Sequence, residues 1–220
     1  MKTRSLSTLA AFAAALAGCA SPMMLSTPLA WRPGDDPSDL RPVTAEFANG
    51  WGGTVQATGP DMSGQVYSAF EGQSLLVTPF TDARVDRSAI GANQEKNPPR
   101  PVTTPDDVAA FVTAHVVDVL RASRVPVVSV EGTRVLKGAI VEYFVREENR
   151  YNGTVMLDLT LTDASGGTLW HGTVHGAQSK WGRSFSADNY NENLSDALVR
   201  AVHQLLMDPA FLAAVHKKSK

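Results

Sequence analysis

The chain has 220 residues, of which 43% are hydrophobic and 19% are charged. This composition excludes wholesale disorder and predicts one ordinary globular domain plus a tail. The formal net charge of -2 provides no basic footprint for nucleic acid, and a single cysteine excludes an internal disulfide.

The first 18 residues have the form of a bacterial export signal. Lys2 and Arg4 make the start basic, and an uncharged run rich in Ala and Leu covers positions 6–16. This run is too short to cross a bilayer, which needs about 20 apolar residues. We therefore predict a signal peptide over 1–18.

The residues at the predicted cleavage point resemble the lipobox of bacterial lipoproteins. They are Leu16, Ala17, Gly18 and Cys19. The resemblance implies that the first three are read as the signal, that the chain is cut before Cys19, and that acyl chains such as palmitate are attached to this cysteine. The alternative is an ordinary signal peptide that happens to contain a cysteine.

Acyl chains on Cys19 would hold the mature chain on a membrane. Each buried methylene contributes about 0.8 kcal/mol, and two or more chains anchor a protein stably. Ala20, rather than an aspartate, follows the cysteine. By resemblance to enteric lipoproteins, this implies delivery to the outer membrane, facing the periplasm, ahead of the inner membrane or the cell surface.

Residues 19–72 are rich in proline and glycine and show no lasting helical or strand period. We predict a lipidated, extended tether here. The segment also contains aromatic residues, which pure linkers avoid. Part of it, 45–58, is therefore expected to pack as an added strand or strap.

A strand, a loop and a helix open the globular domain, which we place at 73–220. The apolar run 74–78 predicts a strand, and a charged loop follows over 81–100. Thr104 as N-cap, followed by a proline and two acids, predicts a helix that ends near Ser123.

Four strands and a second helix follow. The predicted strands lie at 126–130, 135–145, 155–162 and 168–178, with a hairpin turn between the last two. An apolar stripe from Leu194 to Leu206 predicts the C-terminal helix, and Asp208-Pro209 begins a last short one. This order predicts an α+β fold in which a mostly antiparallel sheet carries two helices on one face.

Several short motifs resemble the YajG-like family of bacterial lipoproteins and, more distantly, the amino-terminal domain of TolB and the activator LpoB. They are the segment 76–84 with Ile90-Gly91 after it, the strands at 136–143 and 157–163, Leu169-Trp170-His171-Gly172, and the helix 194–206. The resemblance covers roughly 73–215. It implies an envelope protein that acts by contact with other proteins, and it implies no catalytic residue.

The sequence contains no known catalytic pattern, and we predict no enzyme activity, no cofactor and no metal site. His171 and His175 are four residues apart, but on a strand this step spans about 13 Å, too far for one ion. Trp170, Trp181 and Tyr143 are candidates for a partner surface, because Trp and Tyr are favoured interface anchors. A place in the core and its rim is the alternative for these three. Strict alternation along 135–145 puts Tyr143 on the face opposite to Leu136.

We therefore predict a non-enzymatic binding or envelope-assembly factor. Its partner is expected to be another envelope protein or a peptidoglycan-associated complex. The alternative is a carrier of a small hydrophobic ligand or lipid in a groove between helices and sheet. A hydrolase of peptidoglycan or glycans, which would need two carboxylates at catalytic separation, is a third hypothesis.

Overall fold

A nine-stranded sheet with helices on one face forms the domain in the computed structural model, which describes residues 24–48 and 54–217. The signal peptide and Cys19 lie outside the described residues. The three long strands are β9 (Arg134–Glu147), β10 (Tyr151–Asp163) and β11 (Thr168–Lys180). Each pairs antiparallel with the next, as their alternating apolar pattern and short connections predict.

Short strands extend the sheet on the other side of β9. β4 (Leu75–Val77), β5 (Thr81–Asp82) and β6 (Gly91–Asn93) follow one another along β9 and run parallel to it. β7 (Arg100–Thr103) pairs with β6, β1 (Leu25–Ser26) pairs with β7, and β8 (Val127–Val128) pairs with β4. The order across the sheet is therefore β1, β7, β6, β9, β10, β11.

The segment 81–100, which we predicted as a loop, contains β5, β6 and the start of β7. That prediction was wrong in part. These strands are two to four residues long, which is too short for a period of two to stand out in the sequence.

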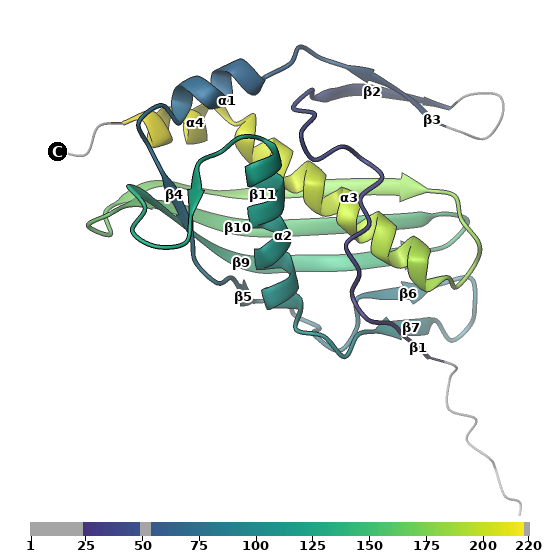
Figure 1. Ribbon diagram of the computed structural model, residues 1–220. Coiled ribbons are helices and arrows are strands. Elements are labelled where there is room, and N and C mark those ends of the chain that lie inside the picture. Colours follow the sequence, from purple (N-terminus) through teal and green to yellow (C-terminus); the bar gives the residue numbers. More distant parts are fainter. Residues whose placement is uncertain (1–23, 49–53, 218–220) are drawn as a thin grey trace, which may run out of the picture.

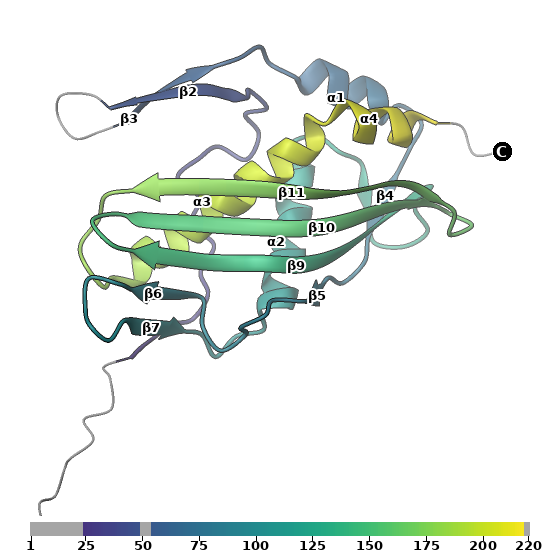
Figure 2. The same ribbon diagram turned by 180° about the vertical axis from the view of Figure 1, so that it is seen from behind.

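Two long helices, α2 (Val108–Ala122) and α3 (Ala187–Leu206), pack on one face of the sheet (Figures 1 and 2). The predicted α+β fold, with two helices on one face of a mostly antiparallel sheet, is confirmed. Two short helices, α1 (Ser63–Ala69) and α4 (Pro209–His216), pack against each other near the C-terminal end of α3.

The N-cap of α2 is Asp107 rather than Thr104. The Asp107 carboxylate accepts hydrogen bonds from the backbone N–H groups of Ala109 at 2.8 Å and Ala110 at 3.1 Å. The Thr104 hydroxyl instead accepts from the N–H of Asp106 at 3.2 Å, in the turn that leads to the helix. A carboxylate at the cap also faces the positive end of the helix dipole, which favours Asp107 in this role.

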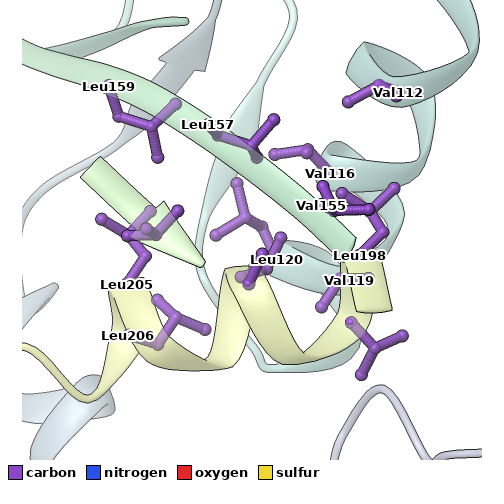
Figure 3. Close-up of a cluster of buried hydrophobic side chains, with 14 of the residues drawn as sticks. Val112, Val116, Val119, Leu120, Val155, Leu157, Leu159, Leu198, Leu205 and Leu206 are labelled. Carbon is purple, nitrogen blue, oxygen red and sulfur yellow. The ribbon is translucent and has the colours of Figure 1, made fainter. Parts of the chain in front are cut away.

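Aliphatic side chains fill the space between the helices and the sheet (Figure 3). Val155, Leu157 and Leu159 alternate along β10 and point toward α2 and α3, where they meet residues such as Val116 and Leu198. Each such side chain contributes about 1.5–3 kcal/mol when it is fully buried. The core therefore lies on one face of the sheet only.

The chain before α1 divides into two parts. Residues 27–42, which we call the strap, cross the outer side of α3 (Figure 1). They lead into a separate two-stranded hairpin made of β2 (Val43–Ala48) and β3 (Thr54–Thr58). The described part of the predicted tether thus contains regular structure in addition to extended chain.

Among the described residues, no single helix is long and apolar enough to span a bilayer. α3 and α4 reach that length and composition only when they are taken together, and a bend of 60° separates them.

Candidate functional site

A row of polar side chains on α3 holds the strap in place. Ser195 and its neighbour Asp196 lie about one turn after Asn191, on the side of the helix that meets the strap. Their side-chain oxygens accept hydrogen bonds of 2.6–3.2 Å from strap backbone N–H groups, namely those of Ala30, Arg32, Gly34 and Asp35. The helix thus satisfies alternate N–H groups of the strap, as a neighbouring strand would.

The carboxylate of Asp196 is the centre of this contact. Its side chain is 0% exposed, and it forms an ion pair with Lys180 at the end of β11. Lys180 also pairs with Glu192 at 2.7 Å, and the side-chain amide of Gln178 donates to Asp196 at 3.3 Å. Burial alone would lower the pKa of the Lys180 ammonium, but Asp196 and Glu192 outweigh it and raise this pKa above its ordinary value. One buried carboxylate therefore ties the strap, α3 and β11 together.

The strap also packs on both helices through its own side chains. The Trp31 indole stacks on the His115 imidazole of α2, with ring centroids 4.4 Å apart and planes 3° from parallel. The His203 Nε2 of α3 lies 2.9 Å from the carbonyl oxygen of Pro37. Burial lowers the pKa of His203, although its contact with that carbonyl opposes the shift. Leu40 is 1% exposed and belongs to the core.

A groove of about 520 Å³ follows the outer edge of β11, and we call it the β11 groove. Its walls are β11, the C-terminal half of α3 and the chain that enters the β2–β3 hairpin. The lining residues are Arg41, Pro42, Val43, Thr173, Val174, His175, Ala177, Arg200, His203, Gln204, Met207 and Asp208. The volume lies in the range of sites that bind small molecules or short peptide segments.

Side chains of α3 reach backbone groups at the edge of β11 inside this groove. The N–H of His175 donates to the Gln204 carboxamide oxygen at 2.5 Å, and Arg200 donates to the carbonyl of Ala177 at 3.0 Å. Because backbone groups of an edge strand face outward at every second residue, those of Thr173 also point into the groove. The groove therefore offers both donors and acceptors to a bound chain or molecule.

The second large surface is the face of the sheet opposite the helices, which no layer of described residues covers (Figure 2). Its charged residues are Lys137, Glu142, Arg146 and Asp158, so cations and anions balance. Asp158 pairs with His171 across β10 and β11 at 2.8 Å. A mixed, partly solvated face of this kind is ordinary for an antiparallel sheet.

The three aromatic residues predicted as a partner surface are not brought together. Tyr143 is 1% exposed and belongs to the core on the helix side of the sheet. Trp170 is half-buried, and its indole N–H donates to Asp208 at 3.1 Å. Trp181 is 61% exposed, with the Arg150 guanidinium 5.1 Å from its ring centroid. Trp170 and Trp181 lie at opposite ends of β11, so only Trp181 presents most of its ring to solvent.

A β-bulge explains the position of Tyr143. The register of β9 against β10 shifts between Met156 and Leu157, which leaves Val141 as an extra residue on β9. Beyond the bulge every side chain changes face, so Tyr143 lies on the same face as Leu136 rather than opposite to it.

A second buried carboxylate, Glu147 at the end of β9, closes the other end of the domain. It accepts hydrogen bonds from the hydroxyls of Tyr190 at 2.7 Å and Ser184 at 2.8 Å, and from the N–H of Phe185 at 2.7 Å. Burial and the neighbouring Glu147 raise the pKa of the Tyr190 hydroxyl. Glu147 thereby fixes the loop between β11 and α3, which is a structural task.

Side chains that could bind a metal ion do not form a cluster in the described part of the chain. His171 and His175 are both exposed on β11, as the sequence places them. Across residues 24–48 and 54–217, no group of three or more His, Cys, Asp or Glu side chains is arranged to hold a metal ion.

Sequence analysis missed the contact between the strap and α3. A signal was present, because Asn191 and Ser195 are four residues apart, with Asp196 next to Ser195, and all three lie in a polar pattern that precedes and overlaps the apolar stripe. The sequence of the strap contains no such signal, because its backbone N–H groups, rather than a pattern of side chains, make most of these hydrogen bonds.

No family model matches the chain, and no curated protein matches it either. Several solved structures are distantly similar to the chain. A Xanthomonas campestris protein of the DUF330 family has a TM-score of 0.48 and 15% identity, over 61% of this chain and 81% of its own. A candidate lipoprotein from Caulobacter crescentus has a TM-score of 0.45 and 12% identity, over 69% and 98%.

A third structure, a lipoprotein from Neisseria meningitidis, has a TM-score of 0.28 and 18% identity, over 60% of this chain and 96% of its own. Similarities this distant carry no argument about family or function, and the YajG-like resemblance stays a prediction.

Proposed function

We propose that this protein is a bacterial lipoprotein of the outer membrane that faces the periplasm and acts as a non-enzymatic binding or envelope-assembly factor. The observation that carries the proposal is the motif Leu16-Ala17-Gly18-Cys19 directly after a basic, then apolar, start. Acyl chains on Cys19 anchor the chain, and the folded domain supplies the binding surface.

Two features of the domain support binding to another protein or to a peptidoglycan-associated complex. The β11 groove is lined by the edge of β11 and by polar side chains of α3, and the backbone groups of Thr173 face into it. The uncovered sheet face carries two cations, Lys137 and Arg146, and two anions, Glu142 and Asp158, which suits a polar interface better than an apolar ligand.

The buried carboxylates also favour a non-enzymatic role. Asp196 and Glu147 are both engaged by several donors that hold the fold together. The carrier alternative has less support, because aliphatic side chains fill the interface between the helices and the sheet over the described residues.

Lipidation is tested by growing cells that express the full chain with labelled palmitate and measuring the mass of the mature protein. We expect label in the wild type, none in Cys19→Ser, and a mature chain that begins at Cys19. A mature chain that begins elsewhere, or one without label, would contradict the proposal.

Binding is tested with a photo-crosslinking amino acid placed at single exposed positions in intact cells. Val43 probes the β11 groove, Lys137 probes the uncovered sheet face, and Ser165 in the hairpin turn is the matched control. We expect one defined adduct from Val43 or Lys137 and none from Ser165. Equal adducts from all three positions, or none from any, would contradict a specific binding surface.

A further inference from the structure

The point at which the amino-terminal segment joins the domain is well defined. β1 pairs parallel with β7 at one edge of the sheet, with Leu25 opposite Val102 and Ser26 opposite Thr103. The next bond, from the N–H of Thr27 to the carbonyl of Thr103 at 3.0 Å, continues this pairing. From Leu25 onward the chain is therefore fixed to the domain.

Only a short length of chain separates this point from the predicted lipid. Cys19 and Leu25 are six positions apart. At 3.3–3.6 Å per residue, six residues reach about 20 Å when fully extended. A free tether over the whole of 19–72 would reach roughly 180 Å by the same rule, but the contacts of the strap with α3 remove most of that length.

β1, which carries the anchor point, and β11, which lines the groove, lie at opposite edges of the sheet (Figure 1). The order from β1 to β11 places four strands between them. With strands 4.7–4.9 Å apart, the two edges are about 24 Å from each other. A domain held by its β1 edge therefore keeps the β11 edge on its far side.

From this geometry we infer that the β1–β7 edge lies against the lipid headgroups and that the β11 groove faces away from the membrane that carries the anchor. The inference rests on the proposed lipidation of Cys19 and deepens the proposed function. The groove then meets a partner that approaches from the periplasm, and it does not take a lipid from the anchoring bilayer.

The short chain between Cys19 and Leu25, rather than attraction between charged side chains and the headgroups, holds the β1–β7 edge against the lipid. The segments on either side of β7 carry charges of both signs, with the cations Lys96 and Arg100 and the anions Glu95 and Asp106. Attraction between exposed charges weakens with added salt, whereas the length of a covalent link does not change. The orientation should therefore be the same at low and high ionic strength.

The test uses the full lipidated chain in vesicles of phosphatidylethanolamine and phosphatidylglycerol that contain a nitroxide-headgroup lipid as quencher. Acylation consumes the only native thiol, so a single introduced cysteine carries the fluorophore. Pro105→Cys marks the β7 side, Thr173→Cys marks the groove and Tyr67→Cys marks α1; all three positions are exposed. We expect several-fold stronger quenching at 105 than at 173 or 67, unchanged by salt.

A longer link provides the matched control. Insertion of 20 Gly and Ser residues after Ala20 adds a flexible chain with a root-mean-square span of about 25 Å. Quenching at 105 should then fall to the level seen at 173. If the three labels are quenched equally in the native chain, or if the insertion has no effect, the orientation is wrong.

The mass of the purified chain separates failure of this inference from failure of the proposed function. An acylated chain with equal quenching at the three positions overturns the orientation and leaves lipidation intact. A chain without acyl groups, which would sediment with vesicles no better than Cys19→Ser, overturns both.

Discussion

Gly176 of β11 lies directly beneath Ala197 of α3, so close that a Cβ atom on Gly176 would overlap the carbonyl oxygen of Ala197. The backbone N–H nitrogen of Ala201 is also within 2.5 Å of the same Cβ position. Backbone atoms, unlike the end of a flexible side chain, cannot move aside without shifting the whole helix. The absence of a side chain at 176 therefore sets the distance between α3 and the edge strand.

We expect Gly176→Ala to lower the free energy of unfolding by about 1–3 kcal/mol or more, because α3 must move off β11. Gly64→Ala is the matched control, since nothing lies within 4 Å of its Cβ position. In the helix α1 that change should stabilise the protein by up to about 1 kcal/mol. Urea unfolding of the mature chain with Cys19→Ser measures both, and equal effects would contradict the close approach.

Asp196→Asn should destabilise the protein by about 2–4 kcal/mol, because it leaves Lys180 without its buried partner. The amide oxygen can still accept from Gly34 and Asp35, so the loss reports the charge rather than the strap hydrogen bonds. Glu192→Gln removes the more exposed partner of the same lysine and should cost about 1 kcal/mol or less. The same urea experiment checks both variants. Similar losses of unfolding free energy from the two variants would show that the burial of Asp196 does not strengthen its ion pair with Lys180.

Leu40→Ala should lower the free energy of unfolding by about 2–5 kcal/mol, because Leu40 is a core residue of the strap. Val43→Ala, three residues later and 42% exposed, should change it by less than about 0.5 kcal/mol. Both positions belong to the segment that the sequence presents as a tether. If this segment were a free tether, neither substitution would change the free energy of unfolding. Equal, near-zero effects in thermal or urea unfolding would therefore contradict the packed strap.

The long elements were visible in the sequence because a single repeating pattern defines each of them. β10 alternates apolar and polar residues over its whole length, and α2 repeats apolar residues at helical spacing. α3 begins at Ala187, earlier than the predicted Leu194, because its first two turns are mostly polar. Asn191 contacts the strap on the outer side, and Tyr190 and Asn193 form hydrogen bonds with β9 and β10 on the inner side. Hydrophobic periodicity cannot detect such a turn.

The candidate site was harder to predict from the sequence than the long helices and strands, because it depends on which distant segments of the chain pack against each other. The β11 groove joins Arg41 to Gln204, and the strap joins Gly34 to Asp196, over separations of more than 160 residues. Residue type suggested Tyr143 as a surface anchor, but the bulge at Val141 moves it to the core. A one-residue irregularity of this kind leaves no mark in an alternating pattern.

The strap should loosen in mild acid through His203. Burial lowers the pKa of this imidazole below its ordinary value, so the folded chain holds fewer protons there than the unfolded chain just below pH 6.5. The free energy of unfolding therefore rises with pH in this window. The stability that comes from keeping His203 neutral is complete above about pH 6.5 and is lost as the pH falls from there toward the pKa in the folded chain. The slope is at most about 1.4 kcal/mol per pH unit.

We expect His203→Gln to flatten the dependence of unfolding free energy on pH between about 6.5 and 5, while its amide can still donate to the Pro37 carbonyl. His216→Gln, at an exposed position near the end of α4, is the control and should keep the wild-type slope. Urea unfolding at half-unit pH steps measures all three proteins. The Asp residues with lowered pKa values, such as Asp36, lose their contribution to stability only below about pH 4, outside this window. A wild-type slope in His203→Gln would place the acid sensitivity elsewhere in the protein.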